Sequence, residues 1–387
     1  MKCNSARIGD VASFRKVSIK PDAGTIYHCY SLPAFDNARK PEVLDGSEIL
    51  SNKLHIENGD ILVNKLNMRF KRIWPIDSLQ ANSVCSTEFV PLCPNEKVDR
   101  NYLLYILMSD DFTNALSGMR TGTSGSHQRV KPEWILDYKF PLPSIEKQRR
   151  IGSFLSSLDQ KIAINTKQND YLAELIDTLF CELVLGALDL SNTVQFSSFL
   201  SERKEKCLSR TNPEYSVTDT GIHPRDSKFH KKLSAATSKN KILRKDDLVF
   251  GISRKILNWG LFEDEIGEVS SAYRVYSIRL LPPEYVARYI AHYQHAFTDI
   301  IKPSSREGQG IMPDALMAKT IPVLDEEAWN RYVQAVESIK EQIRIVTDES
   351  DALAELRDAL LPKLMSGKID VSKVDLTQLN NHLAERC

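Results

Sequence analysis

The stretch EKQRRIGSFLSSLDQKIAINTKQNDYLAELIDTLFCEL, residues Glu146–Leu183, decides the fold of this chain. Its apolar residues recur at steps of three and four, which is the pattern of a long amphipathic helix with a coiled-coil seam. The pattern returns 181 residues later as Glu327–Leu364, where DALAELRDAL repeats DYLAELIDTL. We therefore expect two similar halves, each made of a globular segment followed by one long helix.

Each helix presents an apolar seam that needs a partner, because a single amphipathic rod cannot bury its seam alone. Asn165 and Asn169 interrupt the seam of the first helix, where the second helix has Val346 and Ser350. Such polar residues either fix the register of pairing or mark a local break, and the sequence leaves both readings open. We expect an antiparallel coiled coil built on Leu155, Leu158, Ile162, Leu172, Leu179, Val336, Ile339, Ile343, Leu353 and Leu360.

The repeat divides the chain into residues 1–143 (the first head), 144–188, 189–325 (the second head) and 326–387. DILV at Asp60–Val63 returns as DLVF at Asp247–Phe250, and Gln128–Pro141 returns as Gln309–Pro322. The expected fold is α+β: two globular domains in tandem repeat, separated by two long helices, with a pseudo-two-fold relation between the halves. Within the heads we predict strands around a hairpin-type Asn-Gly turn in Ser47–Lys65, a buried strand at Ile61–Val63, helices at Asn101–Ser109 and Val286–Tyr293, and a strand across Trp134–Pro143.

The composition is that of an ordinary globular protein, with 42% hydrophobic and 26% charged residues. No apolar run reaches the roughly 20 residues that a membrane span needs, and the first residues lack the apolar core of a signal peptide. The seven cysteines contain no CxxC pair. We therefore expect reduced thiols, a cytoplasmic location and no membrane partner, and we read His28–Cys29 as core rather than as a metal site.

The net charge of zero hides an uneven distribution. Residues 1–145 and 196–325 have net charges of +2 and +4, whereas residues 146–195 and 326–387 have −2 and −4. Basic heads favour a polyanion, and acidic helices favour another kind of partner.

Two basic stretches and two Ser/Gly-rich loops are the candidate DNA-binding segments. Lys65–Arg72 contains four cations, and Arg225–Lys245 contains eight against one carboxylate. The loops Arg120–Arg129 and Lys302–Gly310 occupy equivalent places in the repeat, and Arg and Gln suit bidentate contacts to guanine and adenine. We favour DNA binding over a merely solvated surface. The candidate residues are Lys65, Arg69, Lys71, Arg72, Arg120, Thr123, Ser124, Ser126, His127, Gln128, Arg129, Lys228, Lys231, Lys232, Lys241, Arg254, Lys255, Ser304, Ser305, Arg306 and Gln309.

Enzyme signatures are missing from the sequence. It contains no GxxxxGK[ST] phosphate loop, no GxGxxG and no GxSxG. We name no catalytic residue and no metal ligand. Two other readings stay open at this point: an enzyme with a diverged active site, and a coiled-coil scaffold without sequence-specific DNA binding.

The segment FPLPSIEKQRRIGSFLSSLDQKI (140–162) resembles the opening of the first long helix in specificity (S) subunits of type I restriction–modification enzymes. LPKLMSGKIDV (361–371) is similar to the C-terminal helix ending of that family, and His127–Val130 and Gln309–Ile311 look like its loops. The second copy departs from the pattern, because Ala328-Trp329 stands where Gln-Arg is usual. The resemblance spans nearly the whole chain, including its duplicated plan.

The resemblance implies a non-catalytic subunit whose two target-recognition domains each read one half of a split site in double-stranded DNA. The paired helices would set the gap between the halves. Two methyltransferase (M) subunits with S-adenosylmethionine, and restriction (R) subunits with ATP and magnesium, would join it in a bacterial or archaeal cytoplasm for adenine methylation or DNA cleavage. This chain itself would hold no cofactor. An alternative is an S-like module of a methyltransferase complex that lacks a type I nuclease.

Overall fold

The computed structural model describes residues 4–119, 129–207, 212–225, 240–253, 255–302 and 310–369. The chain forms two compact units: residues up to Asp170 together with those from Ile343 onward make the first, and Tyr171–Gln342 make the second. Each unit contains one head and part of both long helices. The predicted pseudo-two-fold relation between the halves stays a prediction.

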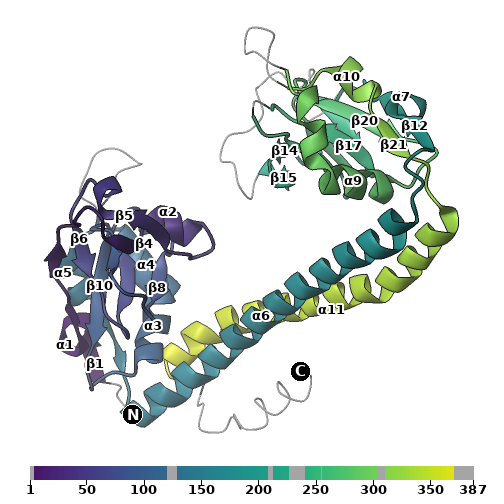
Figure 1. Ribbon diagram of the computed structural model, residues 1–387. Helices are drawn as coiled ribbons and strands as arrows, with labels where there is room; N and C mark the ends of the chain where they lie inside the picture. Colours follow the sequence, from purple (N-terminus) through teal and green to yellow (C-terminus); the bar gives the residue numbers. More distant parts are fainter. Residues whose placement is uncertain are drawn as a thin grey trace. The chain divides into compact units, whose positions relative to one another are not determined.

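The first head holds a four-stranded and a five-stranded sheet (Figure 1). The four-stranded sheet is antiparallel, in the order β2-β10-β7-β8. The order of the other is β3-β6-β9-β4-β5, in which only β4 and β9 pair in parallel. A separate ladder joins the first and last strands of the head, β1 and β11. The strands are β1 (Asn4–Arg7), β2 (Ala12–Phe14), β3 (Ser18–Ile19), β4 (Ile26–Tyr30), β5 (Glu42–Asp45), β6 (Lys53–His55), β7 (Ile61–Asn64), β8 (Ile73–Pro75), β9 (Ser83–Cys85), β10 (Phe89–Pro94) and β11 (Lys139–Leu142).

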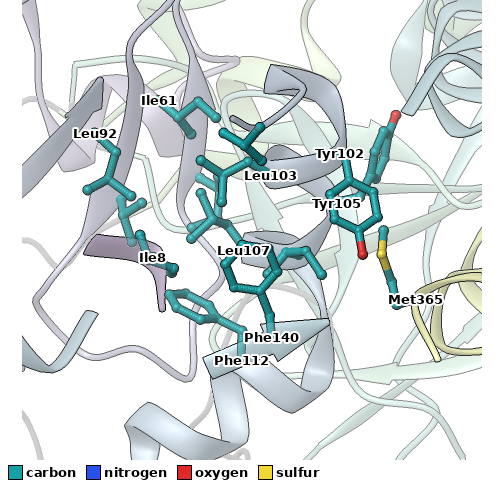
Figure 2. Packing of buried hydrophobic residues seen from close by; sticks show 14 of the residues in the cluster. Ile8, Ile61, Leu92, Tyr102, Leu103, Tyr105, Leu107, Phe112, Phe140 and Met365 are labelled. Carbon is teal, nitrogen blue, oxygen red and sulfur yellow. The ribbon is translucent and has the colours of Figure 1, made fainter. Parts of the chain in front are cut away.

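Helix α3 forms the centre of the core of the first unit. The side chain of Asp99 accepts a hydrogen bond from the Tyr102 backbone and so begins the helix. Buried side chains of α3 pack against Ile8 and Ile61, and Figure 2 shows Met365 of the second long helix beside Tyr102 and Tyr105. The helices of this head are α1 (Ile8–Val11), α2 (Leu32–Asp36), the 3₁₀ helix Gly46–Glu48, α3 (Arg100–Met108), α4 (Asp110–Ser117) and α5 (Pro132–Asp137).

The second head repeats this plan. Its four-stranded sheet has the order β13-β20-β17-β18, which matches β2-β10-β7-β8 strand for strand, and β12 pairs with β21 as β1 pairs with β11. Two further ladders are β14-β15 and β16-β19. The elements are β12 (Thr193–Gln195), α7 (Phe196–Phe199), β13 (Leu200–Glu202), β14 (Tyr215–Thr218), β15 (Gly221–Pro224), β16 (Lys241–Arg244), β17 (Asp247–Phe250), β18 (Trp259–Leu261), β19 (Ile266–Val269), β20 (Arg274–Ile278), α9 (Pro283–His292), the 3₁₀ helix Gln294–Ile300, α10 (Pro313–Met317) and β21 (Thr320–Pro322).

Most of the predicted local elements are confirmed, and two are corrected. Ile61–Val63 lies in the fully buried β7, and α3 and α9 are the predicted helices. The Asn58-Gly59 turn exists, but β6 and β7 lie in different sheets, so it does not form a hairpin. The strand across Trp134–Pro143 is wrong in its first half. Pro132 occupies a first-turn helix position there, and α5 runs to Asp137 before β11 begins.

The long helices pair in the antiparallel sense. Helix α6 is Ile145–Leu179, with a π-helical turn over Phe180–Val184, and α11 is Glu326–Met365. Within the first unit, Asp159 meets Arg357, Asn165 meets Ser350, and Asn169 meets Thr347, so numbers fall along α11 as they rise along α6. None of the ten predicted seam residues is exposed, as expected for residues between paired helices, and their role as the seam stays a prediction.

The two seam asparagines form a bridged polar layer. Asn165 is fully buried and its amide donates to the Ser350 hydroxyl at 3.1 Å and to the Glu349 carboxylate at 3.0 Å. The Asn169 amide donates to the Thr347 hydroxyl at 3.0 Å. Helix α6 continues without interruption through both residues. These contacts support the register reading over the reading of a local break.

Candidate nucleic-acid interface

In the first head the exit turn of β7, residues 65–72, is held at both ends by one buried side chain. The Asn64 amide donates to the Leu66 carbonyl at 2.9 Å, and its oxygen accepts from the Arg72 backbone at 3.3 Å. Asn64 is fully buried at the end of β7, so the strand fixes this clamp. The buried Asn64 therefore holds the turn in a defined conformation at the end of β7.

The end of the Ser/Gly-rich loop lies against this turn. The Val130 backbone donates to the Lys65 carbonyl at 2.8 Å, and Leu66 and Arg129 form an isolated β-bridge. Two segments that the sequence singled out separately are thus neighbours in space. The other predicted residues of this loop, Arg120, Thr123, Ser124, Ser126, His127 and Gln128, lie outside the described residues.

Three of the predicted DNA-binding cations are held by carboxylates from other elements. Two of them, Arg72 and Arg129, form two hydrogen bonds each to one carboxylate, with distances of 2.7–3.2 Å. Hydrogen bonding to Glu88, and then its charge, raises the pKa of Arg129 above its usual value. The ion pairs are Arg72–Asp36, Arg129–Glu88 and Lys71–Asp110. Such pairs fix the orientation of the cations before any ligand arrives.

The remaining predicted cations of this turn, Lys65 and Arg69, form no ion pair with the residues that the structure describes. The Arg69 guanidinium lies 4.9 Å from the centre of the Phe70 ring, and the Arg72 guanidinium lies 5.0 Å from the same ring. Phe70 is partly exposed between the two arginines. The turn thus combines free cations with an aromatic surface, which is a combination that suits nucleic acid.

A cavity of about 440 Å³ opens beside this turn. It brings Asp36 and Glu88 together with Asn67 and Phe70, none of which was among the predicted site residues. No spacing in the sequence connects them, because α2, the β7 exit turn and the start of β10 are far apart along the chain. The full lining is Ser31, Leu32, Pro33, Asp36, Leu66, Asn67, Phe70, Arg72, Ser86 and Glu88.

The second head places its equivalent segments together in the same way. The Gly310 backbone, at the end of the second Ser/Gly-rich loop, donates to the Ser253 carbonyl in the exit turn of β17 at 3.2 Å. The Asn258 amide closes this turn by donating to the Ile252 carbonyl at 2.7 Å. The turn exposes Ile252, Lys255 and Ile256.

Other predicted cations of the second head are not part of this surface or are not described. Lys241 is half-buried in β16, and its ammonium donates to the Tyr273 carbonyl at 2.7 Å. Burial lowers the pKa of Lys241 below its ordinary value. Its contacts hold the head together internally. Lys228, Lys231, Lys232, Arg254, Ser304, Ser305, Arg306 and Gln309 lie outside the described residues.

The described residues contain no group of three or more His, Cys, Asp or Glu side chains that could hold a metal ion. Within the same residues, no helix is both long enough and apolar enough to cross a membrane.

Residues 3–174 match the family model of the type I restriction modification DNA specificity domain. This segment of the chain is similar to that family. The match covers the whole first head, including the β7 exit turn and Arg129, and most of α6. The matched segment thus contains the surface described above for the first head.

Two curated relatives are similar to parts of the chain. The type I restriction enzyme MjaVIII specificity subunit of Methanocaldococcus jannaschii is 30% identical over 98 residues, which are 25% of this chain and 23% of the relative. The HindI specificity subunit of Haemophilus influenzae is 27% identical over 129 residues, 33% of this chain and 28% of the relative. The matched part thus spans about a quarter of each relative's length.

The solved structures include a type I restriction–modification S subunit from M. genitalium, which is 13% identical. The likeness covers 94% of this chain and 96% of that chain, with a TM-score of 0.48. The fold is therefore described by the helices and strands given above and not by this likeness.

Proposed function

We propose that this chain is the DNA sequence-specificity subunit of a type I restriction–modification system. It binds a bipartite site in double-stranded DNA, and each head reads one part. The observation that carries the proposal is the repeated surface. In both heads the turn after the equivalent strand, β7 or β17, lies against the end of a Ser/Gly-rich loop. In the first head this surface lies within the matched specificity domain.

The helices connect the two readers and offer a different surface to proteins. Residues 146–195 and 326–387 are acidic, so they suit DNA poorly. Several apolar side chains of the helices are nevertheless exposed: Ile164, Tyr171, Leu175, Val333, Ile345 and Leu356. We assign this surface to two methyltransferase subunits, which restriction subunits then join. S-adenosylmethionine, ATP and magnesium are assigned to those partners, and this chain contributes recognition without catalysis.

The test is to map N6-methyladenine across the genome of a host that carries this chain with its methyltransferase partner. The expected result is one motif of two short sequences separated by a fixed gap. Replacing residues 1–143 by the head of another specificity subunit is then expected to change one part of the motif and leave the other part and the gap unchanged. A single continuous motif, or a change in both parts, would refute the bipartite reading.

A control separates recognition from general affinity for DNA. Binding of the purified complex is measured on the mapped site and on a scrambled duplex over a range of salt concentrations. Phosphate contacts weaken with salt on both duplexes, whereas base contacts favour only the mapped site. Equal binding to the two duplexes at all salt concentrations would favour a scaffold without sequence specificity.

A further inference from the structure

Asn67 has an unusual combination of backbone and side chain. Its φ of +59° places it in the left-handed region, which few residues other than glycine adopt. Its side chain forms no hydrogen bond with any residue that the structure describes, and it lines the cavity beside the β7 exit turn. Uncommon backbone conformations of this kind cluster at functional sites.

Asparagine is among the few residues other than glycine that tolerate this conformation, so the backbone explains the residue type but not what its amide contacts. Asn82 also has a positive φ, +56°, but its amide donates to the Ile26 carbonyl at 3.3 Å and so serves the fold. Asn67 has no such partner among the residues that the structure describes. The amide of Asn67 lines the cavity and is thus available to a ligand, while a glycine would keep the same backbone without an amide.

The surroundings of Asn67 hold its backbone in place while leaving the amide accessible. Its carbonyl accepts a hydrogen bond from the Phe70 backbone at 3.0 Å, which closes the turn. Asn64 and the bridge to Arg129 fix the turn on either side. Most of the charged groups nearby are already used, because Arg72 is paired with Asp36 and Arg129 with Glu88. Asn67 is therefore held by its backbone on the surface assigned to DNA, and its amide donor and acceptor are unpaired among the described residues.

We propose that Asn67 reads an adenine in the half-site of the first head, through its major-groove edge. An asparagine amide donates to adenine N7 and accepts from the adenine N6 amino group at the same time, and no other base offers this pair of groups in that order. The unpaired Lys65 and Arg69 on the same turn would contact the neighbouring phosphates. This inference rests on the proposed function, because it assumes that the turn faces DNA.

The experiment uses the full chain in complex with its methyltransferase partner and the mapped site. Each adenine of the first half-site is replaced in turn by 7-deazaadenine, which lacks the N7 acceptor. At one position we expect the wild-type complex to bind about tenfold more weakly, within the range for one bidentate base contact. Asn67→Gly keeps the left-handed backbone and removes the amide, so it should bind the normal site about tenfold more weakly and lose its sensitivity to 7-deazaadenine at that position.

Two further variants complete the test. Asn67→Asp keeps the shape but cannot donate to N7, so it should behave like Asn67→Gly. Asn82→Gly is the matched control: it removes an asparagine of the same backbone class outside this turn, and it should keep the response to 7-deazaadenine. The inference is overturned if Asn67→Gly retains wild-type affinity and sensitivity, or if no adenine of the first half-site responds. A wild-type complex that prefers no site at all would instead overturn the proposed function.

Discussion

The two heads share a buried framework that their sequences place at equivalent positions. Arg15 forms two hydrogen bonds to Asp60, at 3.0 and 3.3 Å, and Arg203 forms two to Asp247, at 2.7 and 2.9 Å. Both aspartates are 1% exposed. In the first head this pair links the end of β2 to the start of β7, and in the second head it links the end of β13 to the start of β17. The repetition of a costly buried charge shows that it belongs to the framework of the head.

A second shared feature closes each head where its long helix begins. The Tyr102 hydroxyl donates to the Pro141 carbonyl at 2.8 Å, and the Tyr285 hydroxyl donates to the Pro322 carbonyl at 2.9 Å. Both tyrosine side chains are fully buried. The sequences around the two tyrosines differ, so the two heads share this hydrogen bond and not the neighbouring residues.

The contacts between each head and the helices are different. At the start of α6, the buried Gln148 accepts from the Asp99 backbone at 2.9 Å and donates to the Pro143 carbonyl at 2.9 Å. At the equivalent position of α11, Trp329 packs its ring 6.1 Å from that of Tyr285 instead. Trp329 thus makes an apolar contact with its head where Gln148 makes hydrogen bonds.

About three turns further along, the polar contacts differ as well. In the first unit, Asp159 accepts from the Tyr105 hydroxyl and from Arg357, both at 2.6 Å. In the second unit, Glu284 accepts from Arg288 at 2.9 Å and from Lys340, which holds the repeat position of Asp159, at 2.7 Å. The buried framework is thus common to both heads, whereas the residues through which each head contacts the helices are specific to its unit.

The largest effect is expected from breaking the shared framework. Arg15→Met leaves the buried carboxylate of Asp60 without its charged partner, and Arg203→Met does the same to Asp247. Each variant should lose about 3 kcal/mol of unfolding free energy, because an uncompensated buried charge is costly. Chemical denaturation followed by circular dichroism measures the loss. Arg150→Met is the control, since its partner Glu146 lies on the same exposed helical face, and it should change stability little. If only one of these two arginine variants is destabilised, the buried pair does not have the same role in both heads.

The next effect tests whether docking is specific to each unit. Asp159→Lys installs the residue of the second repeat, so a lysine faces Arg357 and Tyr105 loses its acceptor. We expect a loss of about 2 kcal/mol, from like-charge repulsion and a stranded hydroxyl. Adding Arg357→Ile, which installs the equivalent residue Ile176, should recover part of it, because the repulsion is then gone. If the double variant is as unstable as the sum of the single ones, the two positions are not coupled.

The sequence predicted those features that depend on local pattern. The period of apolar residues between Ile151 and Leu179 was enough to predict the long helix. The repeat was enough to identify Asp60 and Asp247 as equivalent residues. Buried Ile61–Val63 followed from a short β-branched run next to a turn. The antiparallel seam followed because two rods of equal length had only each other as partners within the chain. These predictions need no knowledge of distant contacts.

The features that the sequence missed all depend on pairs that are distant along the chain. Glu88 and Asp36 hold Arg129 and Arg72, but no spacing links them, so all cations of the first head were treated alike. The strand predicted from Trp134 failed because its aromatic and β-branched residues fit a short helix equally well after Pro132. Asn67 lies in the basic stretch Lys65–Arg72 but was not among the candidate residues, because residue type shows neither its backbone conformation nor its lack of a partner among the described residues.

A smaller effect is expected at the polar layer of the helix pair. Asn165→Leu removes a fully buried amide whose oxygen has no partner among the described residues. The groups it leaves behind keep other contacts, because Glu349 stays beside Lys161 at 3.5 Å and the Ser350 hydroxyl donates to the Val346 carbonyl at 2.9 Å. We therefore expect a gain of about 1 kcal/mol in unfolding free energy, measured by thermal melting.

The gain in stability should be accompanied by a loss of unique register. Methylation mapped with the Asn165→Leu variant should show more than one gap length, because an all-apolar seam tolerates slippage. Asn169 is the control, since its contact to Thr347 is exposed. Asn169→Leu should alter the gap less. A destabilised Asn165→Leu with a single gap would show that the amide contributes stability and does not select the register.

The smallest effect concerns a difference between the exit turns of the two heads on the proposed DNA surface. By repeat position, Ile252 and Ile256 of the β17 exit turn correspond to Lys65 and Arg69 of the β7 exit turn. The isoleucine side chains are 39% and 56% exposed, with no polar group to offer a base. The methyl group of thymine is the apolar feature of the major groove. On the proposed function, the second head should therefore detect thymine methyl groups where the first head offers cations.

Replacing thymine by uracil removes only that methyl group. In the second half-site we expect such replacement to weaken binding about fourfold at one position, in line with about 0.8 kcal/mol for one buried methyl-sized group. Ile256→Ala should reduce this sensitivity, and the same replacements in the first half-site should have less effect. The measurement is competition binding by the complex on matched duplexes. An equal response of both half-sites would mean that the charge difference between the two turns does not extend to how they read bases.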